Sequence, residues 1–367
     1  MIPYLPLLLI NARHLTEIEE AVGTTLSSGS YLRGRQTARF EEAYARYTGT
    51  TQCVSCGNGL DALTLIFRAY RELGLLSDGD EVIVPANTYI ASILALSANN
   101  LKPVLVEPDA RTLQIDGSLI ESAVTKHTRA LLIVHLYGRC AYTSAIGEVC
   151  HRHRLLLVED NAQAHGCTFS GRRTGSIGHA AAHSFYPTKN LGALGDAGAV
   201  TTNNRELAEV VRALGNYGSS EKYVFPYKGI NSRMDEVQAA VLNVKLQYLD
   251  SDNLRRREIA HYYYQNIHNE AVSLPAEAST QSVYHIFPIL CPHRDALQRH
   301  LADLGIGTAI HYPIPPHKQA AYKEWHNRSL PVTEMIHQQE LSIPCHPALT
   351  DDEAARIVQA INAFRPS

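Results

Sequence analysis

Three segments of the sequence carry residue types that could do chemistry together. Residues 158–160 are Val-Glu-Asp, the acidic end of an apolar run. Lys189 follows the next β-rich run and lies in a loop bordered by glycine. Residues 57–60, Gly-Asn-Gly-Leu, form a turn directly before a helical pattern. A carboxylate, a lysine amine and a helix start with free N–H groups would offer a proton partner, a nucleophile and an anion site.

An enzyme that uses pyridoxal 5′-phosphate (PLP) needs these three groups. The lysine joins the cofactor aldehyde as a Schiff base and later moves a proton, while a carboxylate keeps the pyridine nitrogen protonated. Backbone N–H groups at a helix start bind the phosphate. Each segment also has an ordinary alternative, because Asp160 could form a turn, Lys189 could be solvated, and the glycine turn could be only a turn. The same turn could hold a nucleotide phosphate, although no nucleotide-binding glycine motif supports that.

The elements that would position these residues alternate between strand and helix. A helix is expected near Thr16, where Thr16 and Glu19 have the spacing of a capping box, and others over 36–47, ending at Gly49, and over 59–73. Strands are expected at residues 52–55, 81–84, 103–106, 130–135, 155–158, 180–185 and 199–202. The alternation predicts an α/β fold with a mostly parallel central sheet flanked by helices. Ligands of such sheets lie at the carboxyl ends of the strands.

The pattern changes after about residue 240. A long helix is expected over 234–249, and a shorter region with its own strand and helix patterns follows as far as Arg365. We therefore predict a large α/β domain over residues 1–240 and a smaller C-terminal α+β domain over residues 241–367.

Composition excludes several classes of function. The 367 residues have a formal net charge of −3 and no basic stripe, so we expect neither a nucleic-acid nor a membrane partner. Cys53 and Cys56 form the only C-x-x-C among seven cysteines, so no metal site is expected. For these two cysteines, a packing role is favoured over a redox pair. The apolar residues 3–10 lack a positive region and a cleavage site, and no apolar run is long enough to span a membrane. The sequence favours a cytoplasmic protein.

Several motifs in order resemble the DegT/DnrJ/EryC1/StrS family of sugar aminotransferases. Besides the three segments above, the resemblance rests on GSYLRG at 29–34, DEVIVPANTY at 80–89, GINSRMDE at 229–236, HYP at 311–313 and PCHP at 344–347. It covers nearly the whole chain. It implies the fold type I of the aspartate aminotransferase group and a homodimer with active sites at the interface.

The resemblance also implies roles for single residues. Lys189 matches the Schiff-base lysine, Asp160 the partner of the pyridine nitrogen, and Gln163 the contact of the phenolic oxygen. The remaining cofactor positions are Tyr89 over the ring face, Ser184, Asn58, Gly59 and Leu60 at the phosphate, and Asn231, which reaches the phosphate from the other subunit. Two runs depart from the family: Asn58-Gly59-Leu60 stands where Ser-Gly-Thr is common, and residues 195–198 read Gly-Asp-Ala-Gly instead of Gly-Glu-Gly-Gly. The first removes a hydroxyl donor and the second could change the shape of the loop.

The implied activity is transfer of an amino group from L-glutamate to a nucleotide-linked keto sugar, through the Lys189 Schiff base and a pyridoxamine phosphate intermediate. Residues 58–63, 99–108 and 216–223 look most like members that aminate C3 of a dTDP-3-keto-6-deoxyhexose. The alternatives are a C4 nucleotide-sugar or cyclitol aminotransferase, or a non-catalytic regulator on the same fold. Candidate diphosphate ligands are Arg33, Arg35, Lys228 and Arg233, and candidate sugar-pocket residues are Tyr186, Tyr217, His165, His311 and His317, although packing or surface roles suit each equally.

Overall fold

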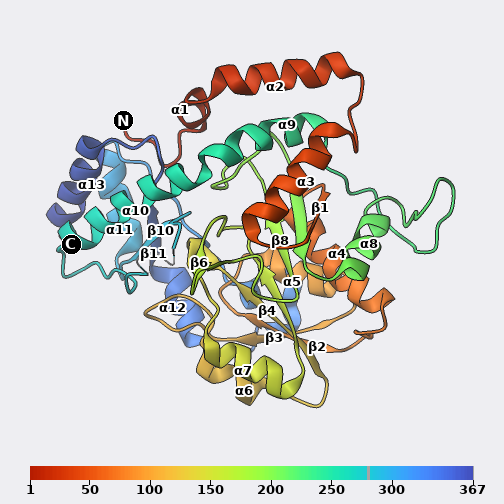
Figure 1. Ribbon diagram of the computed structural model, residues 1–367. Helices are drawn as coiled ribbons and strands as arrows, with labels where there is room; N and C mark the ends of the chain where they lie inside the picture. The colour runs from red at the N-terminus through yellow and green to blue at the C-terminus, as the bar shows by residue number, and fades with distance from the viewer. Residues whose placement is uncertain (279–281, 367) are drawn as a thin grey trace.

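A seven-stranded sheet forms the centre of the computed structural model, which describes residues 1–278 and 282–366 (Figure 1). Its strand order is β1-β9-β8-β5-β4-β2-β3. The strands are β1 Gln52–Cys56, β2 Glu81–Pro85, β3 Lys102–Val106, β4 Thr128–Val134, β5 Leu156–Asp160, β8 Ala180–Ser184 and β9 Gly198–Thr202. Each of the seven expected strands is therefore present within two residues of its predicted bounds.

The sheet is mostly parallel, as the alternation of elements predicts. Strands β3, β2, β4, β5 and β8 pair in parallel, whereas β9 runs antiparallel to both β8 and β1. Val82, Ile83 and Val84 of β2 are all fully buried, because helices cover both faces of the sheet. One face packs against α4 Gly59–Glu72, α5 Ile90–Ser97 and α8 Arg205–Leu214, and the other against α3 Arg35–Thr48, α6 Gly117–Ala123, α7 Ser144–His153 and α9 Glu236–Lys245.

The helix expected near Thr16 is α2, Leu15–Ser28, and it follows the short α1, Leu7–Ala12. The predicted capping box is wrong: His14 is the N-cap, no side chain caps the helix, and Thr16 already lies in its first turn. A capping box needs its Thr at the non-helical N-cap position. Thr350 and Glu353 meet this condition at the start of α13, Asp351–Ala363.

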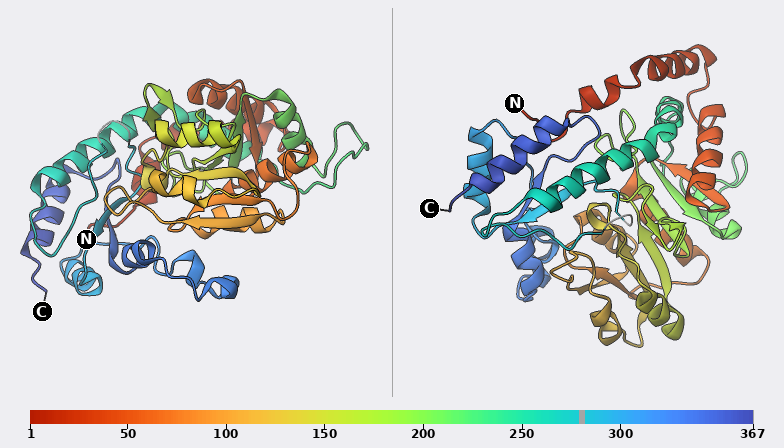
Figure 2. Two further views of the ribbon diagram at one scale, coloured as in Figure 1. Left: turned by 90° about the horizontal axis from the view of Figure 1, so that it is seen from below. Right: turned by 60° about the vertical axis from the view of Figure 1, so that its left-hand side comes forward.

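The helix predicted over 234–249 continues well past its expected end. After α9 and one 3₁₀ turn, α10 runs from Leu249 to Asn266 and reaches the C-terminal elements, as Figure 2 shows in teal. The polar sequence of residues 250–258 hides this helix. Its core-facing positions include Asn253 and Arg256, so the inward face is not uniformly apolar.

A second hydrophobic core gathers the C-terminal elements. The strands β10 Phe287–Leu290 and β11 Glu340–Ile343 pair antiparallel, and α10, α11 Arg294–Asp303 and α13 pack with them, while α12 Pro331–Gln339 leads into β11. Ile2, at the other end of the chain, belongs to the same core and pairs with Ile306. The boundary predicted at residue 240 lies inside α9, and the division into two domains stays a prediction. Within residues 1–278 and 282–366, no helix is long and apolar enough to cross a membrane.

Candidate active site

Asp160 lies at the carboxyl end of β5, in the middle of the sheet. Its side chain is 7% exposed, and its carboxylate accepts hydrogen bonds from Ser92 Oγ at 2.8 Å and from the Ala162 N–H at 3.1 Å. Burial raises the pKa of Asp160, and the Ser92 hydrogen bond and the nearby Lys189 charge oppose that rise. A cation bound beside this carboxyl would therefore keep it ionised.

Lys189 lies in a tight loop that follows β8, the strand next to β5. The loop closes through Lys189 N–H to Tyr186 O and Ala193 N–H to Phe185 O, both 2.8 Å. A Cβ on Gly192 would lie 2.4 Å from Pro187 O, so this closure requires glycine. Burial lowers the pKa of Lys189 to about 8, although Asp160 raises it in part. The amine is thus partly neutral near physiological pH and able to act as a nucleophile or base.

The glycine turn and Ser184 meet at the start of α4. Asn58 Oδ1 accepts from the Asp61 N–H at 2.8 Å and caps the helix, whereas no hydrogen bond is recorded for the N–H groups of Gly59 and Leu60 in the part of the chain that the structure describes. A Cβ on Gly59 would lie 2.5 Å from Ser184 Cβ, so only glycine permits this approach. Two free N–H groups beside a hydroxyl at a helix start suit a dianion.

The run 195–198 supports this turn despite its departure from the family pattern. Gly198 opens β9 and pairs with Cys56, the last residue of β1. A Cβ on Gly198 would lie 2.3 Å from Asn58 O. The glycine at this position therefore sets the path of the turn. Together with buried Asp160 and half-buried Lys189, the turn fits the phosphate, the pyridine nitrogen and the aldehyde of PLP.

Gln163 and Tyr89 meet through a residue that sequence reasoning missed. Gln163 Oε1 accepts from the Tyr137 N–H at 2.6 Å, and Gln163 Nε2 donates to the Tyr312 hydroxyl at 3.0 Å. The ring centroids of Tyr312 and Tyr89 are 5.0 Å apart. Tyr312 lies in the HYP segment and Tyr137 follows β4, so the sequence holds a signal for both positions.

Three histidines lie close enough to Lys189 for its charge to affect their pKa values. Burial together with the Lys189 charge lowers the pKa of His165 to about 3 and of His311 to about 4, and lowers that of His285 well below its usual value. A cavity of about 160 Å³ opens here, lined by Tyr4, Thr188, His285 and His311 among others. His285 and Tyr4 were not expected. His317 is instead fully buried and bonded to Glu334 at 2.9 Å.

Asn231 lies apart from the residues above. It is exposed and pairs with Asn216, and no contact with Lys189 or the phosphate turn is recorded for it in residues 1–278 and 282–366. Its neighbour Ser232 accepts from the Gly57 N–H at 2.9 Å. A role in this site would need a second subunit.

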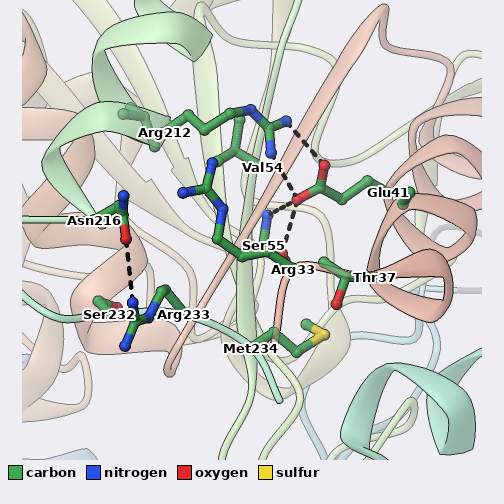
Figure 3. Close-up of a pocket in the computed structure, with 14 residues that line it drawn as sticks. Arg33, Thr37, Glu41, Val54, Ser55, Arg212, Asn216, Ser232, Arg233 and Met234 are labelled. Atoms are coloured by element: carbon green, nitrogen blue, oxygen red, sulfur yellow. Dashed lines mark hydrogen bonds and ion pairs between the residues drawn. The ribbon is translucent and has the colours of Figure 1, made fainter. Parts of the chain in front are cut away.

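A pocket of about 150 Å³ lies between the start of α3 and the end of α8, and arginines point into it (Figure 3). Arg212 pairs with Glu41 at 2.8 Å, and Arg233 donates to Asn216 Oδ1 at 3.1 Å. Arg33 has no recorded hydrogen bond or ion pair within the described ranges, 1–278 and 282–366. Arg35 and Lys228 are exposed, as Arg33 is, but they do not line this pocket. Arg33 and Arg233 thus remain candidate diphosphate ligands.

Comparisons with known proteins find one family along nearly the whole chain. The model of the DegT/DnrJ/EryC1/StrS aminotransferase family matches residues 13–362. The chain is 51% identical to a dTDP-3-amino-3,6-dideoxy-alpha-D-galactopyranose transaminase of Aneurinibacillus thermoaerophilus over 99% of both chains. It is 45% identical to a dTDP-3-amino-3,4,6-trideoxy-alpha-D-glucose transaminase of Streptomyces venezuelae, covering 99% of this chain and 96% of that one. The crystal structure of S. venezuelae DesV in complex with a ketimine intermediate superposes with a TM-score of 0.94 at 45% identity, covering 98% of this chain and 97% of that one.

Proposed function

Because the chain belongs to the DegT/DnrJ/EryC1/StrS aminotransferase family, we propose that it transfers an amino group from L-glutamate to C3 of a dTDP-linked 3-keto-6-deoxyhexose, using PLP. One observation carries the proposal: Lys189 and Asp160 lie together at the carboxyl edge of the sheet. The two relatives at 51% and 45% identity, both named for dTDP-3-amino sugars, support amination at C3.

Different residues of the site bind different parts of the cofactor. PLP, when bound, supplies a ring that accepts the electrons of a carbanion. Asp160 holds the proton on the pyridine nitrogen, and the Gly59 and Leu60 N–H groups with the Ser184 hydroxyl hold the phosphate. The Gln163 amide has two hydrogens: one is donated to Tyr312, and the other contacts the phenolic oxygen. Tyr89 covers the ring face, and Asn58 supports the phosphate turn as its helix cap.

Lys189 transfers the proton of the substrate carbon in both half-reactions. Its Nζ takes the α-proton of the amino donor in the first half-reaction and transfers a proton in the reverse direction when the sugar ketone is aminated. The amine must be neutral to act as a base, and burial, which lowers its pKa to about 8, makes that form accessible. The neutral imidazoles of His165 and His311 line the site without adding positive charge.

The working form is a homodimer with shared active sites in the cytoplasm. Tyr89, Tyr186 and Leu194 at the site are each about half exposed in the single chain. The segment that follows α8 extends away from the body and carries exposed Tyr223 and Phe225 before it reaches Asn231 (Figure 1). Exposed apolar groups of this extent typically mark an interface. A second subunit would cover them, bring Asn231 to the phosphate, and complete the diphosphate contacts with Arg33 and Arg233.

The test is an absorbance titration of the purified protein with PLP. L-Glutamate is expected to remove the long-wavelength cofactor band, and dTDP-3-keto-6-deoxyhexose is expected to restore it. The matched 4-keto sugar should restore the band poorly. If the 4-keto sugar restores it better than the 3-keto sugar, C4 replaces C3 as the site of amination. A cyclitol ketone tests the remaining alternative. Absence of any cofactor band with added PLP would refute the proposal. Lys189→Ala is the control that should lack the band.

A further inference from the structure

Two segments beside the candidate active site pack directly on each other. Residues 136–140 follow β4 and residues 161–167 follow β5. Gly138 has φ +90°, and a Cβ there would lie 3.0 Å from Gln163 O, so the two backbones touch. The Tyr137 N–H also donates to Gln163 Oε1 at 2.6 Å. The position of the Gln163 side chain therefore depends on how these segments pack.

Cys140 and Cys167 meet at this contact. Their thiols are hydrogen-bonded to each other, and both residues pack with Ala164 and Val283 in one small cluster. Cys167 is fully buried, whereas Cys140 is half-buried and keeps part of its surface open to solvent. A disulfide forms only between cysteines whose Cα atoms lie within roughly 7 Å of each other, and the contact of Gly138 with Gln163 brings the two segments side by side.

The surroundings make Cys140 the reactive member of the pair. The hydrogen bond from the Cys167 thiol lowers the pKa of Cys140, with His135 adding to the effect, whereas burial raises the pKa of Cys167. The thiolate is the reactive form, so an accessible thiol of lowered pKa beside a second thiol has the features of a redox-sensitive pair. Burial raises the pKa of each of the other cysteines, which are Cys53, Cys56, Cys150, Cys291 and Cys345. The C-x-x-C at 53–56 is thus a packing pair.

We propose that Cys140 and Cys167 form a redox modification site, at which hydrogen peroxide joins the two sulfurs in a disulfide that ties residues 136–140 to residues 161–167. The Cys140 thiolate attacks one peroxide oxygen, the O–O bond breaks, and the hydroxide that leaves takes a proton to become water. Cys167 Sγ then attacks the Cys140 sulfenic acid, the S–O bond breaks, and the oxygen leaves as water with the Cys167 proton. Overall, two thiols lose two electrons and one peroxide is reduced to two waters.

The disulfide acts on the site through Gln163. Pulling the two sulfurs to bonding distance shifts the turn that carries Gln163 relative to the Tyr137 N–H. We expect oxidation to lower the transamination rate reversibly, and this part rests on the proposed function. In a reducing compartment such a bond would form only transiently, as a response to oxidant.

The test begins with wild-type holoenzyme treated with hydrogen peroxide. The protein is expected to lose two of its seven thiols, with peptide mapping showing a Cys140–Cys167 link that dithiothreitol reverses. Cys140→Ser should lose no thiol pair, and the matched control Cys150→Ser should still form the link. In Cys167→Ser, a sulfenic acid trap should label Cys140. An unchanged thiol count, or a link between other cysteines, would overturn the proposal.

The rate is then measured before oxidation, after oxidation and after reduction. A wild-type rate that falls and recovers, with Cys140→Ser unaffected by peroxide, supports the link to Gln163. A disulfide that leaves the rate unchanged would overturn that link. Because thiol counting needs no turnover, its failure is distinct from failure of the proposed function.

Discussion

At the scale of single residues, Lys189 and Asp160 influence each other's charge. Burial lowers the pKa of the lysine and raises that of the aspartate, which favours the neutral form of both. Their mutual attraction opposes both shifts and favours the charged forms. Removing one partner should therefore move the other toward neutrality.

Asp160→Asn should lower the pKa of Lys189 further below its ordinary value. The carboxylate stabilises the ammonium form, so its loss favours the free amine at lower pH. The rate at which cofactor-free protein captures PLP, followed against pH, should rise with a midpoint that is lower in the variant than in wild type. Asp303→Asn, an exposed aspartate on α11, should leave the midpoint unchanged. A midpoint that stays or rises in Asp160→Asn would contradict the coupling.

Replacing Lys189 by Ala should abolish proton transfer from the donor. A positioned base contributes roughly 10²–10⁴-fold, so transamination and exchange of the glutamate α-proton into D₂O should both fall by at least about 10²-fold. Added methylamine, a small base that fits the space left by the side chain, should restore part of the exchange. Exchange at the wild-type rate without Lys189 would assign the base to another residue.

At the scale of elements, Glu236 joins two helices that are far apart in sequence. It is 2% exposed, and its carboxylate accepts from the N–H groups of Gly34, Gln36 and Thr37 at 2.8–2.9 Å and from the Thr37 hydroxyl. It thus caps the start of α3 from the first turn of α9. Burial opposes ionisation, but these hydrogen bonds together lower the pKa of Glu236.

Glu236→Ala should cost about 2–4 kcal/mol in the free energy of unfolding, because several buried donors lose a charged acceptor. The folded-state pKa is depressed, so the stabilisation is full above the unfolded value of about 4.3 and is lost as pH falls through the folded pKa. Urea unfolding at pH 7 and at low pH measures both effects. Glu206→Ala, on the exposed first turn of α8, should change stability little. An equal loss at both pH values would exclude an ionic contribution.

The sequence predicts the sheet well because its strands are short apolar runs between turn signals. It predicts α10 poorly because Asn253 and Arg256 face inward and interrupt the apolar stripe. Inside the fold these two side chains are paired: Asn253 donates to His165 O at 2.8 Å, and Arg256 donates to Cys345 O. Hydrogen bonds of this kind offset part of the cost of burying polar groups, and they are visible only once distant segments are placed together.

The same limit applies to the candidate site. Asp160 and Lys189 follow neighbouring strands, so a general rule about strand ends predicts that they meet. Tyr4 and His285 reach the site from distant parts of the chain, and no local pattern indicates that. The catalytic and cofactor-binding roles carried over from the family resemblance stay predictions for all nine residues: Lys189, Asp160, Gln163, Ser184, Tyr89, Asn58, Gly59, Leu60 and Asn231.

At the scale of the whole molecule, residues 316–325 anchor the C-terminal elements to the large core. The rings of Tyr322 and Trp325 stack at 4.4 Å between centroids, and both belong to the core formed by α4, α5 and α8 with the sheet. The Tyr322 hydroxyl also hydrogen-bonds Ser97 Oγ of α5 at 2.9 Å. Trp325 is the only tryptophan, so its fluorescence reports on this contact alone.

Tyr322→Ala should shift the emission of Trp325 to longer wavelength, because the indole loses its stacking partner and gains water. The cavity and the lost ring should also cost about 3–5 kcal/mol in stability. Tyr322→Phe keeps the stack and should shift emission little, while losing about 1 kcal/mol from the Ser97 hydrogen bond. Identical spectra for Tyr322→Ala and wild type would mean that Trp325 is held without Tyr322.

Subunit complementation tests whether two chains share each active site. Lys189→Ala and Asn231→Ala should each be impaired alone. If Lys189 of one chain works with Asn231 of its partner, a mixed dimer of the two variants contains one complete site. Co-expression with different tags should then recover about one quarter of wild-type activity per subunit in a statistical mixture of closed dimers.

The matched control is a mixed dimer of Lys189→Ala with Asp160→Asn. Both residues serve the site of their own chain, so each site of that mixed dimer lacks one group and no activity returns. No recovery in the first pair despite a purified mixed dimer would place Asn231 outside the partner's site, and recovery in the control pair would show that Lys189 and Asp160 do not serve the same site.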